Sequence, residues 1–257
     1  MENSRHICCV VIGLYQGLQL RQHKIMELER MRLHEFSNGL YPRRVTIYLV
    51  EKGLTTIERV DHNPMNGNWP SAELKALNRA GTVPVLEADD GAVICSSIAI
   101  LEYLEEKFPT PTMLGPTAEA RARVRELVSI ADEMTTHFSV WNHKGSALFS
   151  GHEPQNQVAG GFAAQAYYKK LNLLEQRAAE KKGEFLAGDK VTIADCVAMA
   201  VLQFAEVFHG VPVPSTAPVV GEWYSRFSAR PSAVGCVYPQ NILDVSRGLL
   251  QQCPPLA

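Results

Sequence analysis

Polar and apolar residues alternate in short runs in the first part of the chain, as is typical of β-strands. The alternation predicts strands over Arg32–Phe36 and Leu54–Val60. Two more strands are predicted over Gly81–Leu86 and Ala92–Cys95, and the intervening Asp89-Asp90-Gly91 is a hairpin signal. We therefore expect the last two strands to pair antiparallel.

Helical signals separate these strands. Pro42 opens an amphipathic run that should end at Gly53, because proline suits the first turn and glycine the position after the last one. Ser71 is placed to cap a short helix, and Ser97–Phe108 repeats apolar residues at helical spacing. The predicted order from residue 32 to 108 is βαβ–αββα, a small α/β domain.

Strand signals stop after the proline-rich linker at 109–117, and the rest of the chain reads as helical. Thr192 and Asp195 fit a capping box, and Gly183 is expected to close the preceding helix. The predicted helices are Ala118–Gly145, Phe162–Lys182, Thr192–Phe208 and Pro218–Ala229. The chain is thus expected to consist of an extension (1–31), an α/β domain (32–108), the linker and a helical domain (118–257).

Composition narrows the function classes. The 257 residues carry 25 Lys and Arg against 27 Asp and Glu, and this net charge of -2 gives no electrostatic basis for binding nucleic acid. The longest early apolar run, Ile7–Leu14, is too short to span a bilayer, so no membrane association is expected. The six cysteines show no CxxC spacing, which favours a reducing, cytoplasmic location, and the histidines lack the spacing of a metal site.

Five sequence segments occur in an order that resembles the glutathione transferase family, from Leu33 to Ser232. The segments are YPRRVTIYLVEKGL at 41–54, GTVPVLEADDG at 81–91, SSIAILEYLEEKFP at 96–109, FLAGDKVTIAD at 185–195 and WYSRFSARPSA at 223–233. The chain is most similar to the microbial group without a dedicated Tyr or Cys after the first strand. The resemblance implies a thioredoxin-like α/β domain followed by an all-α domain, glutathione as cofactor and a homodimer.

An enzyme that uses a thiolate at neutral pH must lower a thiol pKa that is ordinarily near 8.5. Hydrogen-bond donors and a helix N-terminus both stabilise the anion. Ser37, Asn38 and Gly39 precede the helix that Pro42 opens, so Ser37 and Asn38 are the first catalytic candidates, and Asn38 is also a candidate for binding glutathione. The alternative is that these residues only form a turn.

The resemblance also assigns glutathione-binding residues in the α/β domain. Val83–Pro84 matches the family's Val-cis-Pro, whose backbone pairs with the peptide part of glutathione. Ser97 matches the residue that holds the γ-glutamyl carboxylate at a helix N-terminus, although it could equally serve as a plain N-cap. Ser96 stands where relatives commonly have Glu or Asp, and Trp69-Pro70 stands near a usual His or Lys, so the site departs from the family pattern.

In the related microbial group, a serine and a histidine hold a water that takes the thiol proton. Ser139 and His143 lie four residues apart on one face of a predicted helix and are the matching candidates, with His137 as a second choice. His143 could instead be a solvated residue near the helix end. Nearby aromatic residues suit either an apolar substrate pocket or the core: Phe138, Trp141, Phe149, Tyr167 and Tyr168.

These observations predict a glutathione transferase that joins the thiolate of glutathione to a small apolar electrophile. One alternative is a glutathione-dependent cis–trans isomerase that uses the same thiolate on a conjugated alkene. Another is a non-catalytic binding or regulatory module, which the departures at Ser96 and Trp69-Pro70 keep open. Disulfide reduction is disfavoured because residues 37–41 contain no cysteine.

Overall fold

The structure, a computed structural model, describes residues 30–64, 67 and 69–249. The described residues form two compact units, one comprising 30–36 and 54–100 and the other 37–53 and 101–249. The extension expected over 1–31 lies outside the described residues, apart from Arg30 and Met31, as do Cys8, Cys9 and Cys253.

The first unit contains a four-stranded sheet in the order β2-β1-β3-β4. Its strands are β1 (Arg32–Glu35), β2 (Glu58–Asp61), β3 (Val85–Glu87) and β4 (Val93–Cys95). β1 pairs parallel with β2 and antiparallel with β3, and β3 pairs antiparallel with β4, as the hairpin signal predicts. The strand expected over Leu54–Val60 begins only at Glu58, because β1 offers just the four partners from Arg32 to Glu35.

Two short helices accompany these strands in chain order. α3 (Ala72–Leu77) begins at Ser71, whose side chain accepts a hydrogen bond from the Leu74 N–H at 3.1 Å, which confirms the predicted cap. α4 (Ser97–Lys107) follows β4 after a single residue, and its start is also as predicted. The order β1-α2-β2-α3-β3-β4-α4 matches the sequence prediction.

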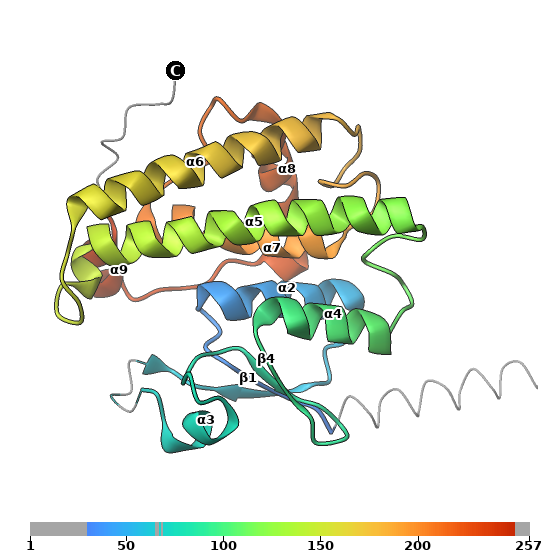
Figure 1. Cartoon of the computed structure of the whole chain (residues 1–257), viewed down its shortest axis with the longest axis horizontal. Coiled ribbons are helices and arrows are strands. Elements are labelled where there is room, and N and C mark those ends of the chain that lie inside the picture. Colours follow the sequence, from blue (N-terminus) through green and yellow to red (C-terminus); the bar gives the residue numbers. More distant parts are fainter. Residues whose placement is uncertain (1–29, 65–66, 68, 250–257) are drawn as a thin grey trace, which may run out of the picture. The chain divides into compact units, whose positions relative to one another are not determined.

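The second unit is built from helices. They are α2 (Leu40–Lys52), α5 (Ala118–Gly145), α6 (Gln157–Ala179), α7 (Ile193–Gln203), α8 (Pro218–Ser228) and α9 (Gln240–Ser246), with short turns at Ala147–Phe149 and Pro231–Ala233. α5 and α6 lie side by side over most of their length (Figure 1). Every residue of α7 is buried, so this helix is the centre of the unit, where it packs against α5 and α2.

The buried start of α7 carries the predicted capping box. Asp195 is fully buried and accepts hydrogen bonds from the Thr192 N–H and hydroxyl, both at 2.8 Å. The Leu186 N–H and the Trp223 indole N–H also donate hydrogen bonds to the Asp195 carboxylate, at 3.0 and 2.9 Å. Burial raises the pKa of Asp195 to about 6, while these hydrogen bonds act in the opposite direction. Asp195 therefore ties the start of α7 to α8 and to the preceding loop.

Several helix boundaries differ from the predictions. α2 begins at Leu40, two residues before Pro42, which is tolerated because the first N–H groups of a helix have no intrahelical acceptor. α6 begins at Gln157, where Asn156 caps it, instead of at Phe162. The chain from Phe204 to Phe208 forms a π-helix, although it was expected to continue the α-helix.

The prediction that Gly183 closes a helix is wrong, since α6 ends at Ala179. Gly183 instead lies against the backbone of Gly188 in the following turn. A Cβ at position 183 would fall far inside van der Waals distance of the Gly188 carbonyl group. Glycine is needed here for close packing of two backbone segments.

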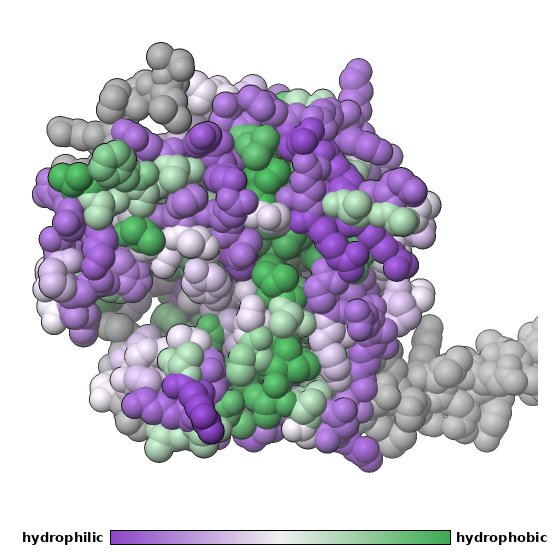
Figure 2. All heavy atoms as spheres, in the orientation of Figure 1, coloured by the Kyte–Doolittle hydropathy of each residue, from purple (hydrophilic) through white to green (hydrophobic). Residues whose placement is uncertain are grey.

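Apolar side chains also reach the surface at the start of α6. Val158 and Phe162, four residues apart, are 69% and 68% exposed. Figure 2 shows green hydrophobic spheres over this end of α6 among purple neighbours. Within the described residues, no helix combines the length and the apolar character that crossing a membrane requires.

Candidate active site

The N-terminus of α2 carries the first two catalytic candidates. Ser37 is exposed, Asn38 is half-buried, and Gly39 is the N-cap residue. Ser71 and Thr117 cap α3 and α5 with side-chain oxygens, whereas in the described part of the chain no side chain caps α2. The first N–H groups of α2 and the positive end of its dipole are therefore available to an anion.

Residues 236–238 hold Asn38 and its neighbour in place, and nothing in the sequence pointed to this contact. The Asn38 side-chain amide donates to the Val237 carbonyl at 3.1 Å, and the Tyr238 hydroxyl donates to the Asn38 carbonyl at 3.0 Å. The Cys236 thiol donates to the Ser37 carbonyl at 3.6 Å. Both candidates thus contact a segment that follows them by about 200 residues.

Ser139 and His143 lie on one face of α5, both half-buried. The His143 ring contacts Glu153 through Nδ1 at 2.5 Å and stacks on Phe149 with centroids 4.0 Å apart. Hydrogen bonds from Lys144 and then from His143 hold the pKa of the Glu153 carboxyl below its usual range. Because Nδ1 faces Glu153, Nε2 is the nitrogen of His143 through which it could hold a water.

No hydrogen bond among the described residues joins Ser139 or His143 to Ser37 or Asn38. The two pairs belong to the same compact unit, but each is held by different partners. The structure therefore brings Ser37 and Asn38 together at one helix start, and Ser139 and His143 together on another helix.

The first unit contains the residues assigned to glutathione by resemblance. The Val83–Pro84 peptide bond is cis, as the resemblance implies. Ser97 is the first residue of α4 and is only 3% exposed. Ser96 adopts a positive φ of 81°, a left-handed conformation that residues other than glycine rarely take and that is concentrated at functional sites.

The aromatic candidates for a substrate pocket belong to the core. Phe138, Trp141 and Tyr167 are at most 2% exposed, and their ring centroids lie 5.3 to 5.9 Å apart. Tyr168 is half-buried beside Tyr167, and Phe149 stacks on His143. The core interpretation therefore holds for Phe138, Trp141 and Tyr167.

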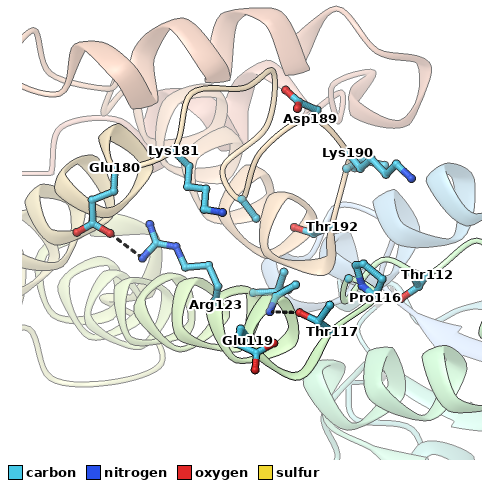
Figure 3. A pocket seen from close by; sticks show the side chains of 15 residues that line it. Thr112, Pro116, Thr117, Glu119, Arg123, Glu180, Lys181, Asp189, Lys190 and Thr192 are labelled. Carbon is cyan, nitrogen blue, oxygen red and sulfur yellow. Dashed lines mark hydrogen bonds and ion pairs between the residues drawn. The ribbon is translucent and has the colours of Figure 1, made fainter.

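A hollow of about 760 Å³ lies elsewhere in the second unit, between the linker, the start of α5 and residues 180–192 (Figure 3). Its ionisable side chains balance, with three basic (Arg123, Lys181, Lys190) and three acidic (Glu119, Glu180, Asp189). Arg123 and Glu180 form an ion pair at 3.1 Å, drawn as a dashed line in Figure 3. None of the predicted site residues lines this hollow. In the described part of the chain, no cluster of three metal-ligating side chains occurs.

Known protein families match both halves of the chain. Residues 33–112 match the N-terminal domain of glutathione S-transferase, and residues 152–231 match its C-terminal domain. Glutathione S-transferase 2 of Saccharomyces cerevisiae is 31% identical over 208 residues, which cover 79% of this chain and 88% of the yeast protein. The chain belongs to the glutathione S-transferase family.

Other family members extend the comparison. Maleylacetoacetate isomerase of Rattus norvegicus is 33% identical over 181 residues, covering 68% of this chain and 79% of the rat protein. The crystal structure of a glutathione S-transferase domain-containing protein from Marinobacter aquaeolei is 31% identical, with a TM-score of 0.69 over 79% of this chain and all of that chain. The predicted fold, an α/β domain joined to a helical one, is thereby confirmed.

In this glutathione S-transferase, sequence reasoning missed the residues that surround Asn38. Val237 and Tyr238 lie beyond the last segment of the resemblance and show no helical or strand periodicity. The hydroxyl of a buried tyrosine usually finds a hydrogen-bond partner, but this tendency does not single out Asn38 as the partner of Tyr238.

Proposed function

We propose that the protein is a glutathione transferase that activates the glutathione thiol at the N-terminus of α2. The observation that carries the proposal is the start of this helix at Gly39, uncapped by a side chain and directly preceded by Ser37 and Asn38. Open N–H groups, the helix dipole and nearby polar side chains all favour a thiolate over a thiol. Each unit by which they lower the thiol pKa corresponds to about 1.4 kcal/mol.

The family resemblance assigns the remainder of glutathione to residues of the first unit. We assign the backbone of Val83, before Pro84, to pairing with the peptide part of glutathione, as the family resemblance implies. We assign Ser97, buried at the first position of α4, to a carboxylate of glutathione, which its hydroxyl and the adjacent N–H groups would bind. The left-handed backbone of Ser96 turns the chain directly from β4 into that helix start.

We propose that Ser139 and His143 hold a water molecule that accepts the proton of the glutathione thiol. His143 is held by Glu153 through Nδ1, so Nε2 is the nitrogen we assign to a water in that role. The thiolate then forms a C–S bond with a small apolar electrophile, which either loses a leaving group with its bonding electrons or, in an addition to a double bond, takes up a proton. The product is a thioether.

A glutathione-dependent isomerase is the second candidate, and the likeness to the rat maleylacetoacetate isomerase favours it. The same thiolate site would serve a conjugated alkene, with glutathione regenerated at the end of each cycle. The two activities differ in stoichiometry. A transferase consumes one glutathione per product, whereas an isomerase leaves the glutathione concentration constant.

A titration with glutathione tests the proposal, using calorimetry for binding and thiolate absorbance against pH for the bound thiol. We expect binding and a thiol pKa at least one unit below 8.5 in the wild type, with a higher value in Asn38→Ala. Asn172→Ala, at an exposed position of α6, is the matched control and should behave as the wild type. His143→Ala should lower kcat by about 100-fold or more, the usual contribution of general acid–base catalysis.

The outcomes separate the three functions. Absence of glutathione binding at millimolar concentration would exclude both enzymes. Binding without consumption or isomerisation of any alkene or electrophile tested would favour the non-catalytic module.

A further inference from the structure

The chain from Arg230 to Tyr238 runs along α2 in the opposite direction to the helix (Figure 1). Arg230 binds Glu51 near the C-terminus of α2, and Tyr238 reaches Asn38 just before its N-terminus. The 13 residues of α2 span about 20 Å at 1.5 Å each. The eight residue steps from Arg230 to Tyr238 can span this distance, because an extended chain covers about 3.3 to 3.6 Å per residue. The segment 230–238, which begins with the short turn at Pro231–Ala233, therefore lies along the helix, and we call it the C-terminal brace.

Polar side chains fix the middle of the brace. Gln203 donates from Nε2 to the Ala233 carbonyl at 2.8 Å and accepts from Arg43 Nε at 2.9 Å. Arg43 also donates from Nη2 to the Val234 carbonyl at 2.7 Å. Gln203, at the end of α7, and Arg43 of α2 thus bind two consecutive carbonyl groups of the brace.

Two hydrogen bonds join the end of the brace to Asn38, and Asn38 is the donor in one and the acceptor in the other. Asn38 donates to Val237, and Tyr238 donates to Asn38, so the side chain and the backbone of Asn38 are both held. The Tyr238 ring packs against Phe208 with centroids 4.4 Å apart, which fixes the position of its hydroxyl. Burial is the main cause that raises the pKa of Tyr238, and the neighbouring Cys236 thiol adds to it. The hydroxyl therefore keeps its proton at neutral pH and can donate.

We infer that Tyr238 is a positioning residue for the thiolate site, and that the C-terminal brace fixes the donors at the start of α2 through its bonds to Asn38. The inference rests on the proposed function. Donors stabilise a developing or bound anion best when they are fixed before the ligand arrives. Without the Tyr238 hydroxyl, the loop of Ser37, Asn38 and Gly39 loses one of the bonds that set its backbone. The thiolate should then be stabilised less.

Tyr238→Phe tests the inference because it removes only the hydroxyl and keeps the ring on Phe208. The matched control is Tyr224→Phe, which deletes the hydroxyl of another half-buried tyrosine, one that bonds Glu206 instead of Asn38. The readouts are the absorbance of bound glutathione thiolate against pH and the pH profile of kcat/KM. In Tyr238→Phe we expect the thiol pKa to rise by about half a unit to one unit.

The pH profile distinguishes positioning from a general loss of structure. At pH 6.5, kcat/KM of Tyr238→Phe should fall about three- to tenfold and should approach the wild-type value at high pH, where the thiol ionises unaided. A merely structural defect would lower activity equally at all pH values. Asn38→Ala combined with Tyr238→Phe should raise the thiol pKa by less than the sum of the single changes, because both act on one loop.

Failure of the inference and failure of the proposed function give different results. A wild type that lowers the thiol pKa, together with an unchanged profile in Tyr238→Phe, would overturn the inference alone. A wild type that does not bind glutathione would overturn both.

Discussion

Arg230 donates two parallel hydrogen bonds to Glu51, from Nε to Oε1 at 2.7 Å and from Nη2 to Oε2 at 2.6 Å. The Glu51 side chain is only 5% exposed, and the Ser232 hydroxyl adds a third bond at 2.5 Å. Burial alone would raise the pKa of Glu51, but the bonds from Arg230 and Ser232 bring it below its ordinary value. The pair anchors the C-terminal brace where it begins.

Replacement of Arg230 by lysine should lower the free energy of unfolding by about 1 to 2 kcal/mol. Lysine keeps the charge but cannot form the planar two-bond contact with a carboxylate. Urea denaturation at neutral pH measures the difference. Arg226→Lys is the control because its ion pair with Glu222 is long, at 4.0 Å, and exposed. Equal stability of the two variants would contradict the role assigned to the paired bonds.

Lys52 and Glu105 form a buried ion pair that should be costly to break. Their side chains are 0% and 2% exposed, and the Glu105 carboxylate also accepts from the Tyr48 hydroxyl and the Met113 N–H. Lys52→Met leaves this carboxylate without its cation, so we expect a loss of about 3 to 5 kcal/mol. The same measurement on Arg125→Met, whose partner Glu102 is partly exposed, should show less than about 1 kcal/mol.

His209 should make the fold less stable in acid. It is 2% exposed, donates from Nδ1 to the Ser246 carbonyl at 2.9 Å, and burial lowers its pKa to about 4. The pKa of His209 is lower in the folded protein than in the unfolded chain, where it is near 6.5. As the pH falls, the unfolded chain therefore takes up a proton at His209 before the folded protein does. The stability that depends on a neutral His209 is fully present above pH 6.5 and is lost as the pH falls from 6.5 towards 4. At pH 5 the loss amounts to about 2 kcal/mol.

Urea denaturation at pH 7.5 and pH 5.0 checks this sign and size. His209→Asn keeps a donor for Ser246 but cannot be protonated, so its free energy of unfolding should fall by about 2 kcal/mol less between the two pH values than that of the wild type. A steeper fall in the variant would show that His209 is not the group responsible.

Gly183→Ala should destabilise the turn between α6 and α7 by about 1 to 3 kcal/mol, as overpacking usually does. The added methyl group would meet the backbone of Gly188, which cannot move aside as a side chain can. Gly151→Ala provides a control, since a Cβ there meets no atom within 4 Å. Thermal unfolding of the two variants makes the comparison. A normal melting temperature for Gly183→Ala would mean that the turn yields easily.

Local signals were sufficient to predict much of the fold. Ser71 and Asp195 act at fixed short spacings on nearby N–H groups, so their caps can be identified from a few residues. Gly53 ends α2 with a positive φ of 70°, which is also a local requirement. The early end of α6 and the π-helix at 204–208 were missed because packing within the unit, and not local preference, sets them.

The candidate site could be predicted only in part, for a related reason. The polar character of Ser37 and Asn38 and the following helix start can be read from adjacent residues. Their partners Val237 and Tyr238 cannot, because 199 and 200 positions separate the bonded groups and the intervening segments must fold first. No short pattern encodes such a pairing.

This separation has a consequence for synthesis on the ribosome. Asn38 is among the first residues of the described chain to emerge, but its bonding partners are translated some 200 codons later. The loop before α2 therefore lacks its final contacts until residues 236–238 have been made. A nascent chain that stalls or is cut before Val237 would lack those contacts however well its earlier helices have formed. The final conformation of this loop thus depends on residues that are made some 200 codons after it.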